Sequence, residues 1–195
     1  MTNRREFLQI GVAATALPFA THARAATLGL GAESTDIVPL YKALYDVRFP
    51  DSVAFARRIE QHGIRVHAIE GDMTRFWYDE LYHVWRNGPA AIAGLTAHGP
   101  LFCLERLAWD QGMRVVFRGE HRYADARIEH SIAGPVALLR DTAGPGSLEP
   151  WPAGVADAIA HCPSGRAELA QASRSNSRVA GESLYSWVIA PAAKV

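Results

Sequence analysis

The sequence lacks the features that define several large protein classes. Two of its 195 residues are cysteine, its formal net charge at pH 7 is zero, and its apolar runs are short. A membrane-spanning helix needs about 20 apolar residues, so stable membrane insertion is not expected. Because no block of Lys and Arg stands out, neither nucleic acid nor an anionic membrane is expected as the main partner.

The motifs of common catalytic and cofactor sites are absent as well. The chain has no CxxC or CxxCH, no HExxH, no Gly-Lys-Ser/Thr phosphate loop, no GxGxxG fingerprint and no GxSxG elbow. These absences exclude the motif-defined haem, zinc-protease, nucleotide-binding and α/β-hydrolase classes. The sequence therefore predicts no metal and no cofactor.

The two cysteines, Cys103 and Cys162, leave two alternatives open. In an oxidising compartment they could form a disulfide, or both could be buried thiols that act as small hydrophobic residues. No signal in the sequence places them within bridging distance. Cys103 lies close to His98 and could be an activated nucleophile, but its place beside the apolar face of a helix favours a buried structural thiol.

What the sequence does contain begins with paired arginines. Arg4-Arg5 precedes a weakly apolar run, Ile10–Phe19, and a small-x-small site at Ala23-Arg24-Ala25. This order resembles a twin-arginine export signal, although Asn3 and Gln9 depart from the usual pattern. The resemblance implies recognition of Arg4 and Arg5 by the export machinery, a periplasmic location, and cleavage near Ala25 or retention of the segment as a tether. The apolar run would span only about 15 Å as a helix.

Strand and helix patterns alternate through the first half of the remaining chain. Strands are expected at 43–49, 64–69, 90–96 and 114–118, and helices at about 51–63, 72–87 and 99–112. This rhythm predicts βαβ units, a parallel sheet and helices on both of its faces. It is similar to flavodoxin-like and Rossmann-like sheets, although Thr96 stands where a receiver domain carries a phosphorylatable Asp.

The second half of the chain changes character. Residues 121–123 and 127–132 are expected to form an antiparallel hairpin, 141–154 a loop, 155–161 a short helix and 184–189 a C-terminal edge strand. Residues 164–183 are polar, either helical or mobile. The predicted fold is a single α/β domain, 26–195: an open, mostly parallel sheet of about four strands, extended by the hairpin and the edge strand.

The carboxyl ends of parallel strands are the expected position of a ligand. Polar residues at these ends are interpreted as a ligand-binding set of Ser52, Thr96, His98, Gly99 and Glu120. If the protein is an enzyme, the acid/base is expected to be His98 or His121, with Asp51 or Asp72 as its partner.

The hairpin suggests a metal hypothesis that its own geometry weakens. One register would place Glu120 opposite His130 and His121 opposite Glu129. Because adjacent residues on a strand point to opposite faces, the four side chains could not meet at one ion. Ordinary cross-strand charge pairs are expected instead.

The helix at 99–112 has two apolar sides. Leu101, Leu104 and Leu107 form the main face, whereas Phe102 and Trp109 lie on a second side. The second side is either covered by the C-terminal segment or is a partner surface. The leading hypothesis is an exported protein without a catalytic motif that binds a small molecule or a partner protein; the alternative is a periplasmic enzyme with a sheet-end site.

Overall fold

The computed structural model describes residues 36–124, 127–136, 138–139, 150–164, 169–173 and 183–192. The expected export signal therefore lies outside the described residues, as do residues 141–149 of the expected loop and most of the polar segment 164–183. No helix in the described part of the chain is long and apolar enough to cross a membrane.

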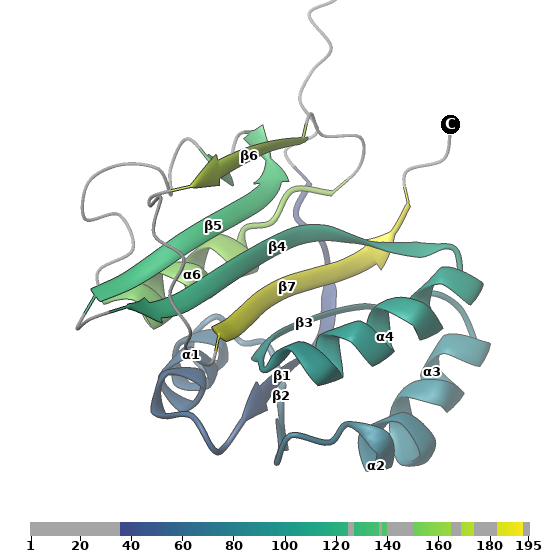
Figure 1. Ribbon diagram of the computed structural model, residues 1–195. Helices are drawn as coiled ribbons and strands as arrows, with labels where there is room; N and C mark the ends of the chain where they lie inside the picture. Colours follow the sequence, from purple (N-terminus) through teal and green to yellow (C-terminus); the bar gives the residue numbers. More distant parts are fainter. Residues whose placement is uncertain are drawn as a thin grey trace, which may run out of the picture. The chain divides into compact units, whose positions relative to one another are not determined.

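The domain is a mixed α/β structure built on one seven-stranded sheet (Figure 1). The strand order is β2-β1-β3-β7-β4-β5-β6. β1 pairs in parallel with β2 and β3, and every other neighbouring pair is antiparallel. The strands are β1 (Leu40–Asp46), β2 (Val66–Ile69), β3 (Ala91–Thr96), β4 (Met113–Ala124), β5 (Arg127–Pro135), β6 (Leu169–Ser173) and β7 (Ser183–Pro191).

The expectation of a mostly parallel sheet is wrong beyond the third strand. β4 does not lie beside β3, because β7 from the end of the chain inserts between them and runs antiparallel to both. β7 is therefore a central strand rather than the expected edge strand. Its residues from Ser186 to Ala190 are buried, as expected for a strand covered on both faces.

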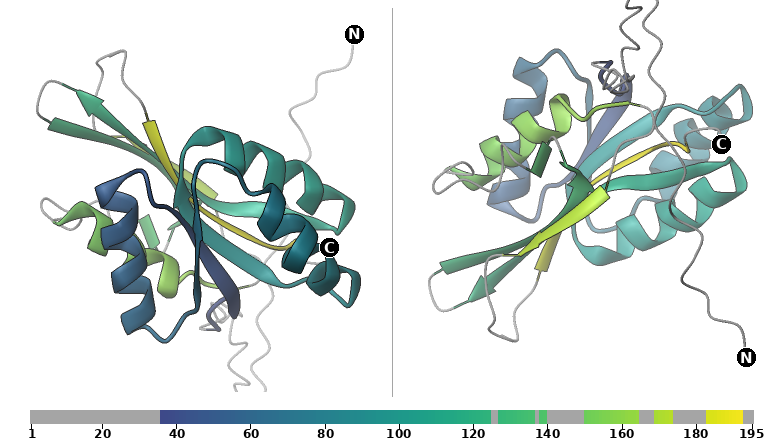
Figure 2. Two further views of the ribbon diagram at one scale, coloured as in Figure 1. Left: turned by 90° about the horizontal axis from the view of Figure 1, so that it is seen from below. Right: turned by 90° about the horizontal axis from the view of Figure 1, so that it is seen from above.

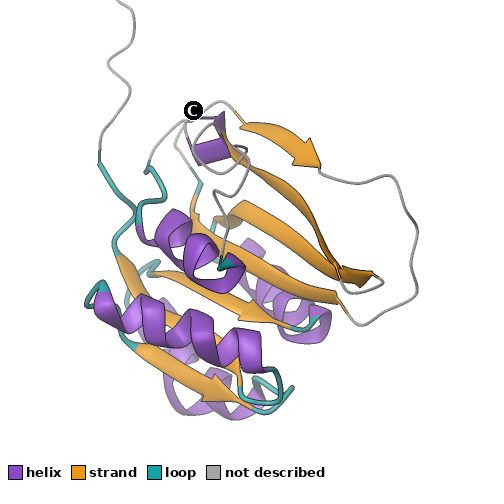
Figure 3. Cartoon of the chain, turned by 90° about the vertical axis from the view of Figure 1, so that its left-hand side faces the viewer, coloured by secondary structure: helices purple, strands orange, loops and turns teal. Residues whose placement is uncertain are grey.

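Helices cover both faces of the sheet, as predicted (Figures 2 and 3). α1 (Pro50–Gln61) and α6 (Trp151–Ala160) pack on one face, here called the α1/α6 face. α4 (His98–Asp110) and the segment α2-η1-α3 pack on the other, the α4 face. In that segment α2 is Thr74–Phe76, the π-helix η1 is Trp77–Leu81 and α3 is Tyr82–Arg86.

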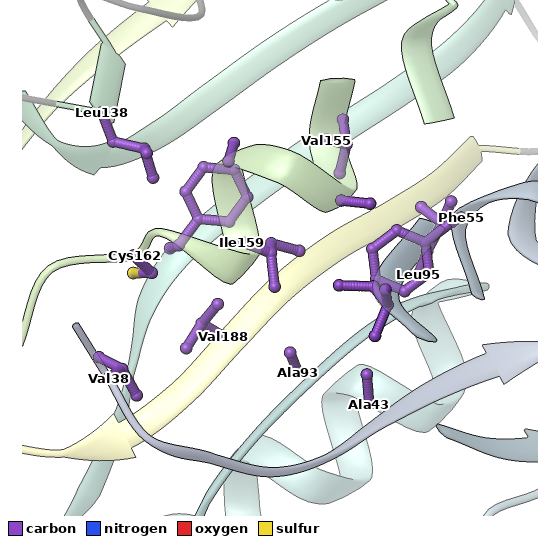
Figure 4. Packing of buried hydrophobic residues seen from close by; sticks show 14 of the residues in the cluster. Val38, Ala43, Phe55, Ala93, Leu95, Leu138, Val155, Ile159, Cys162 and Val188 are labelled. Carbon is purple, nitrogen blue, oxygen red and sulfur yellow. The ribbon is translucent and has the colours of Figure 1, made fainter. Parts of the chain in front are cut away.

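Each face has its own hydrophobic core. On the α1/α6 face, Phe55 and Ile59 of α1 and Val155 and Ile159 of α6 pack against β1, β3, β4 and β7 (Figure 4). On the α4 face, side chains from α2, η1, α3 and α4 surround the fully buried Trp187 of β7. Gly94 of β3 leaves room for this indole, because an added Cβ would lie 2.5 Å from Trp187 Cζ2.

Three further elements of the second half differ from expectation. β4 is one strand that covers both the expected strand 114–118 and the expected hairpin strand 121–123. α6 begins at Trp151, inside the expected loop, because Pro152 falls in its first turn, where a helix does not need the missing N–H. β6 lies inside the segment expected to be helical or mobile. It pairs antiparallel with β5 and so satisfies backbone groups that β5 would otherwise leave unpaired.

The cysteines are both free thiols. Cys103 is exposed on α4, whereas Cys162 is buried in the core of the α1/α6 face. The sheet separates the two residues, so the disulfide alternative does not hold in this structure. The expectation that Cys103 is buried is wrong, since its side chain lies on the outer side of α4.

Candidate functional site

The expected sheet-end residues near α1 are used by the fold itself. Ser52 is buried, donates a short hydrogen bond to the Leu95 carbonyl oxygen, and accepts one from the Asp46 backbone N–H at 2.8 Å. Its hydroxyl therefore ties the end of β1 to β3 and does not face a ligand. Asp51 accepts a hydrogen bond from the Tyr123 hydroxyl, and burial together with this carboxylate raises the pKa of Tyr123.

The residues at the start of α4 divide between the interior and the surface. Thr96 is buried, where its hydroxyl accepts a hydrogen bond from Trp187 Nε1 at 3.2 Å. His98 is exposed, with its ring centroid 5.2 Å from that of Tyr185 and 6.0 Å from that of Phe102. Gly99 is also exposed. A ligand at this position could contact His98 and Gly99, but not the hydroxyl of Thr96.

Glu120 lies on the α4 face of β4, in a polar cluster. It accepts hydrogen bonds from Arg122 at 2.8 Å and from Ser183 Oγ at 3.4 Å. The hydrogen bond from Arg122 is the largest cause of the lowered pKa of Glu120. Tyr185, whose pKa is raised by burial and then by Glu120, lies between this cluster and His98. Tyr185 thus links two members of the expected ligand set that are distant in sequence.

His121 lies in a buried polar cluster that the sequence did not predict. Its Nε2 lies 2.7 Å from Ser186 Oγ and its Nδ1 lies 2.7 Å from His130 Nδ1. Trp151 of α6 stacks on the cluster, with ring centroids 4.6 Å from His121 and 5.6 Å from His130. Burial and then the neighbouring His130 hold the pKa of His121 well below its usual value.

The register of the hairpin explains this cluster. β4 and β5 pair His121 with His130, Glu120 with Ser131 and Arg122 with Glu129. The expected register differs from the observed one by one residue, and a difference of one residue places each side chain beside a different partner. The two histidines consequently face each other on the α1/α6 face. A signal was present in the sequence, because the period of two places His130 on the same strand face as the apolar Ile128 and Ile132.

The hydrogen-bond order Ser186–His121–His130 matches that of a nucleophile, its base and an orienting group. A nucleophile must also reach its substrate, yet Ser186 and His121 are 0% exposed. The cluster is therefore assigned a structural role: it joins β4, β5 and β7 beneath α6.

The four candidate catalytic residues lie at separate places. His98 is exposed beside aromatic rings, His121 is buried, Asp51 pairs with Tyr123, and Asp72 accepts a hydrogen bond from the Thr74 N–H at 2.8 Å. Within the described ranges, neither His98 nor His121 hydrogen-bonds a carboxylate. The described residues also contain no group of three or more His, Cys, Asp or Glu side chains placed to hold a metal ion.

The outer side of α4 carries an ordered aromatic surface. Phe102 is 47% exposed and Trp109 is 44% exposed. Arg106, which the sequence reading missed, lies between them, with its guanidinium carbon 5.3 Å from the Phe102 ring centroid and 4.2 Å from that of Trp109. The i, i+4, i+7 spacing of the three residues places them on one side of the helix. We call these three residues the α4 surface.

A small pocket opens next to the α4 surface, between α4 and the sheet. Its volume is about 230 Å³, and its rim carries the ion pair between Arg118 Nη2 and Glu105 Oε2 at 2.6 Å. The lining is otherwise mainly apolar and consists of Val115, Val116, Phe117, Ala133 and Gly134. Glu105 lies one helical turn from both Phe102 and Trp109, so pocket and surface adjoin.

Comparison with known proteins adds no family to this description. No family model, curated protein or solved structure matches the chain. Its function is therefore argued from the geometry of its own side chains.

Proposed function

We propose that this chain is an exported accessory protein that binds a partner protein through the α4 surface and has no catalytic site of its own. The observation that carries the proposal is the contact of the Arg106 guanidinium with two half-exposed aromatic rings. Trp and Arg are the residue types most enriched among side chains that dominate binding energy at interfaces. Stacking also orders all three side chains before binding, which lowers the entropy cost of association.

A partner protein accounts for this surface better than a small molecule does. Pockets that bind drug-sized ligands enclose about 300–1,000 Å³, whereas the pocket beside α4 has about 230 Å³. A pocket of this size suits one side chain of a partner that also covers Phe102 and Trp109. The alternative of a sheet-end enzyme receives less support, because Ser52 and Thr96 are engaged inside the fold and the candidate acid/base residues are separated.

The native cysteine on α4 allows a direct test. Cys103 is exposed next to Phe102, while Cys162 is buried, so a benzophenone maleimide should label Cys103 of the folded protein selectively. After incubation with the exported fraction of the source cells and irradiation, we expect a discrete cross-linked product. Phe102→Ser and Trp109→Ser should abolish that product.

Tyr78→Ser is the matched control, because Tyr78 is an exposed aromatic residue that belongs to η1 and not to α4. It should leave the product unchanged. A product that survives Phe102→Ser and Trp109→Ser, or the absence of any product, would overturn the proposal.

Export is tested separately. Replacing Arg4 and Arg5 by lysine should keep the protein in the cytoplasm, because the paired guanidinium groups are the proposed recognition element. Arg24→Lys, which retains the pair, is the control. Cell fractionation and immunoblotting measure how much of each variant is exported. Equal export of the two variants would contradict the twin-arginine route.

A further inference from the structure

We infer that the partner presents a carboxylate to Arg106, on a segment whose neighbouring side chains are apolar. This inference rests on the proposed function and names the chemistry that the α4 surface recognises. It makes Arg106 the residue that sets specificity, with Phe102 and Trp109 on either side as apolar contacts.

The geometry of Arg106 supports a charged ligand. Its guanidinium carbon lies 5.3 Å from the Phe102 ring centroid and 4.2 Å from that of Trp109, within the range of a cation–π contact with each ring. The N–H donors of a guanidinium lie along the edge of its planar fork, and a cation–π contact does not use them as hydrogen-bond donors. Such an edge matches the two oxygens of a carboxylate.

Neighbouring arginines show what Arg106 lacks. Arg118 pairs with Glu105 at 2.6 Å and Arg122 pairs with Glu120 at 2.8 Å, so both already have a carboxylate within the chain. In the described part of the chain, Arg106 makes no ion pair, although Asp110 lies one turn further along α4. Arg106 therefore retains its capacity to bind an external carboxylate.

The surroundings favour a carboxylate over a phosphate. Glu105 and Asp110 lie on the same helix, within one turn of Arg106 on either side. These negative charges repel a phosphate dianion more strongly than a carboxylate monoanion. The two aromatic rings beside Arg106 also favour a carboxylate whose neighbouring side chains are apolar. Such neighbours exclude water, which strengthens both the cation–π contacts and the ion pair.

The test uses a phage-displayed library of random 12-residue peptides, selected on the full chain. Some selected clones should bind the wild-type chain but not the Phe102→Ser variant. We expect the peptides of those clones to carry Asp or Glu next to apolar residues. A synthetic peptide of the enriched sequence should lose about tenfold to hundredfold in affinity for Arg106→Gln, as expected for a hydrogen-bonded charge pair. Arg106→Lys should also weaken binding, because it keeps the charge but loses the planar fork.

Arg57→Gln removes the same charge from the exposed side of α1 and should leave affinity unchanged. Enriched peptides without acidic residues, or equal affinity for Arg106→Gln, would overturn the inference while leaving the proposed function standing. If no selected peptide depends on Phe102, the inference and the proposed function both fail.

Discussion

Individual side chains in the interior are satisfied by specific partners, and the cluster of His121, His130 and Ser186 is the clearest case. Two imidazoles and a hydroxyl share hydrogen bonds of 2.7 Å beneath Trp151. Buried polar groups of this kind stabilise a fold only while every partner is present. The cluster is therefore sensitive both to crowding and to protonation.

Gly119 makes room for the cluster. A Cβ at this position would lie 2.4 Å from Ser186 Oγ and 3.0 Å from His121 Nε2. Gly119→Ala is therefore expected to lower the free energy of unfolding by about 1–3 kcal/mol, as for other overpacked sites. Urea unfolding measures the change, and the double variant Gly119→Ala/Ser186→Ala should recover part of it.

Gly99→Ala serves as the control, because a Cβ there meets no atom within 4 Å. It should leave the stability unchanged or raise it slightly. Equal destabilisation by the two alanine substitutions would contradict a steric origin in the cluster.

Protonation of His121 should couple stability to pH. Burial lowers the pKa of His121 in the folded state, while the unfolded chain retains the ordinary histidine pKa of about 6.5. Below that pH the unfolded chain binds a proton that the folded chain does not bind, so the free energy of unfolding falls as the pH falls. The stabilisation that comes from the neutral imidazole is complete above about pH 6.5. His121→Asn should reduce this slope by up to about 1.4 kcal/mol per pH unit.

Urea unfolding between pH 5 and 8 measures the slope, and the exposed His83→Asn is the control. In the wild-type chain the His121 ring should titrate by NMR well below the ordinary histidine pKa of about 6.5, a measurement that does not depend on the folding of the variant. A wild-type His121 that titrates near pH 6.5 would contradict the expectation.

At the scale of elements, β7 joins two differently organised parts of the sheet. On one side lie β3, β1 and β2, which run parallel, and on the other lie β4, β5 and β6, which form an antiparallel meander. β7 donates side chains to both hydrophobic cores, with Val188 in one and Trp187 and Ile189 in the other. An edge strand would leave one backbone edge unpaired and would tolerate polar substitutions.

A polar substitution distinguishes a central β7 from the edge strand expected from sequence. Val188→Asn should lower the free energy of unfolding by about 3 kcal/mol, from lost apolar burial and an amide without partners. Val47→Asn, the same change at a residue that is 45% exposed, should stay within about 0.5 kcal/mol of wild type. Similar small effects at both sites in urea unfolding would contradict the central position.

Across the whole domain, the sheet separates two environments with different chemistry. The core of the α1/α6 face holds Cys162, where burial raises the thiol pKa to about 12. Cys103 and the α4 surface lie on the opposite side and face solvent. The thiolate is the reactive species, so the two cysteines should differ strongly in reactivity.

Thiol counting tests this separation. Ellman's reagent should modify one thiol of the folded protein, Cys103, and both thiols after denaturation, while Cys103→Ser should leave none reactive in the folded state. Intact mass spectrometry of untreated protein should show no two-dalton loss from disulfide formation. A native protein with no reactive thiol would contradict the exposed position of Cys103.

Local elements were predictable because their causes are local. The helix 50–61 follows from its apolar spacing, and the chain leaves it through Gly63, which has a φ of 74°. The strand 91–96 follows from a continuous apolar run. The exposed pair Phe102 and Trp109 was likewise visible as a second side of its helix. Arg106 could have been added to that pair by the same spacing.

The sequence by itself determined the mixed α/β class, the approximate places of the first three strands and the two apolar sides of the helix at α4, because these depend on residues close together in the chain. The first strand, expected at 43–49, lies at Leu40–Asp46, since Pro50 begins α1 and the chain turns before it. Tertiary structure alone decided that β7 lies between β3 and β4, and that His121 faces His130 rather than Glu129. Strand order and register depend on which distant surfaces bury together, and a one-residue change in register alters every pairing. The sequence could name His121 as a residue of interest, but only the tertiary structure could supply its partners.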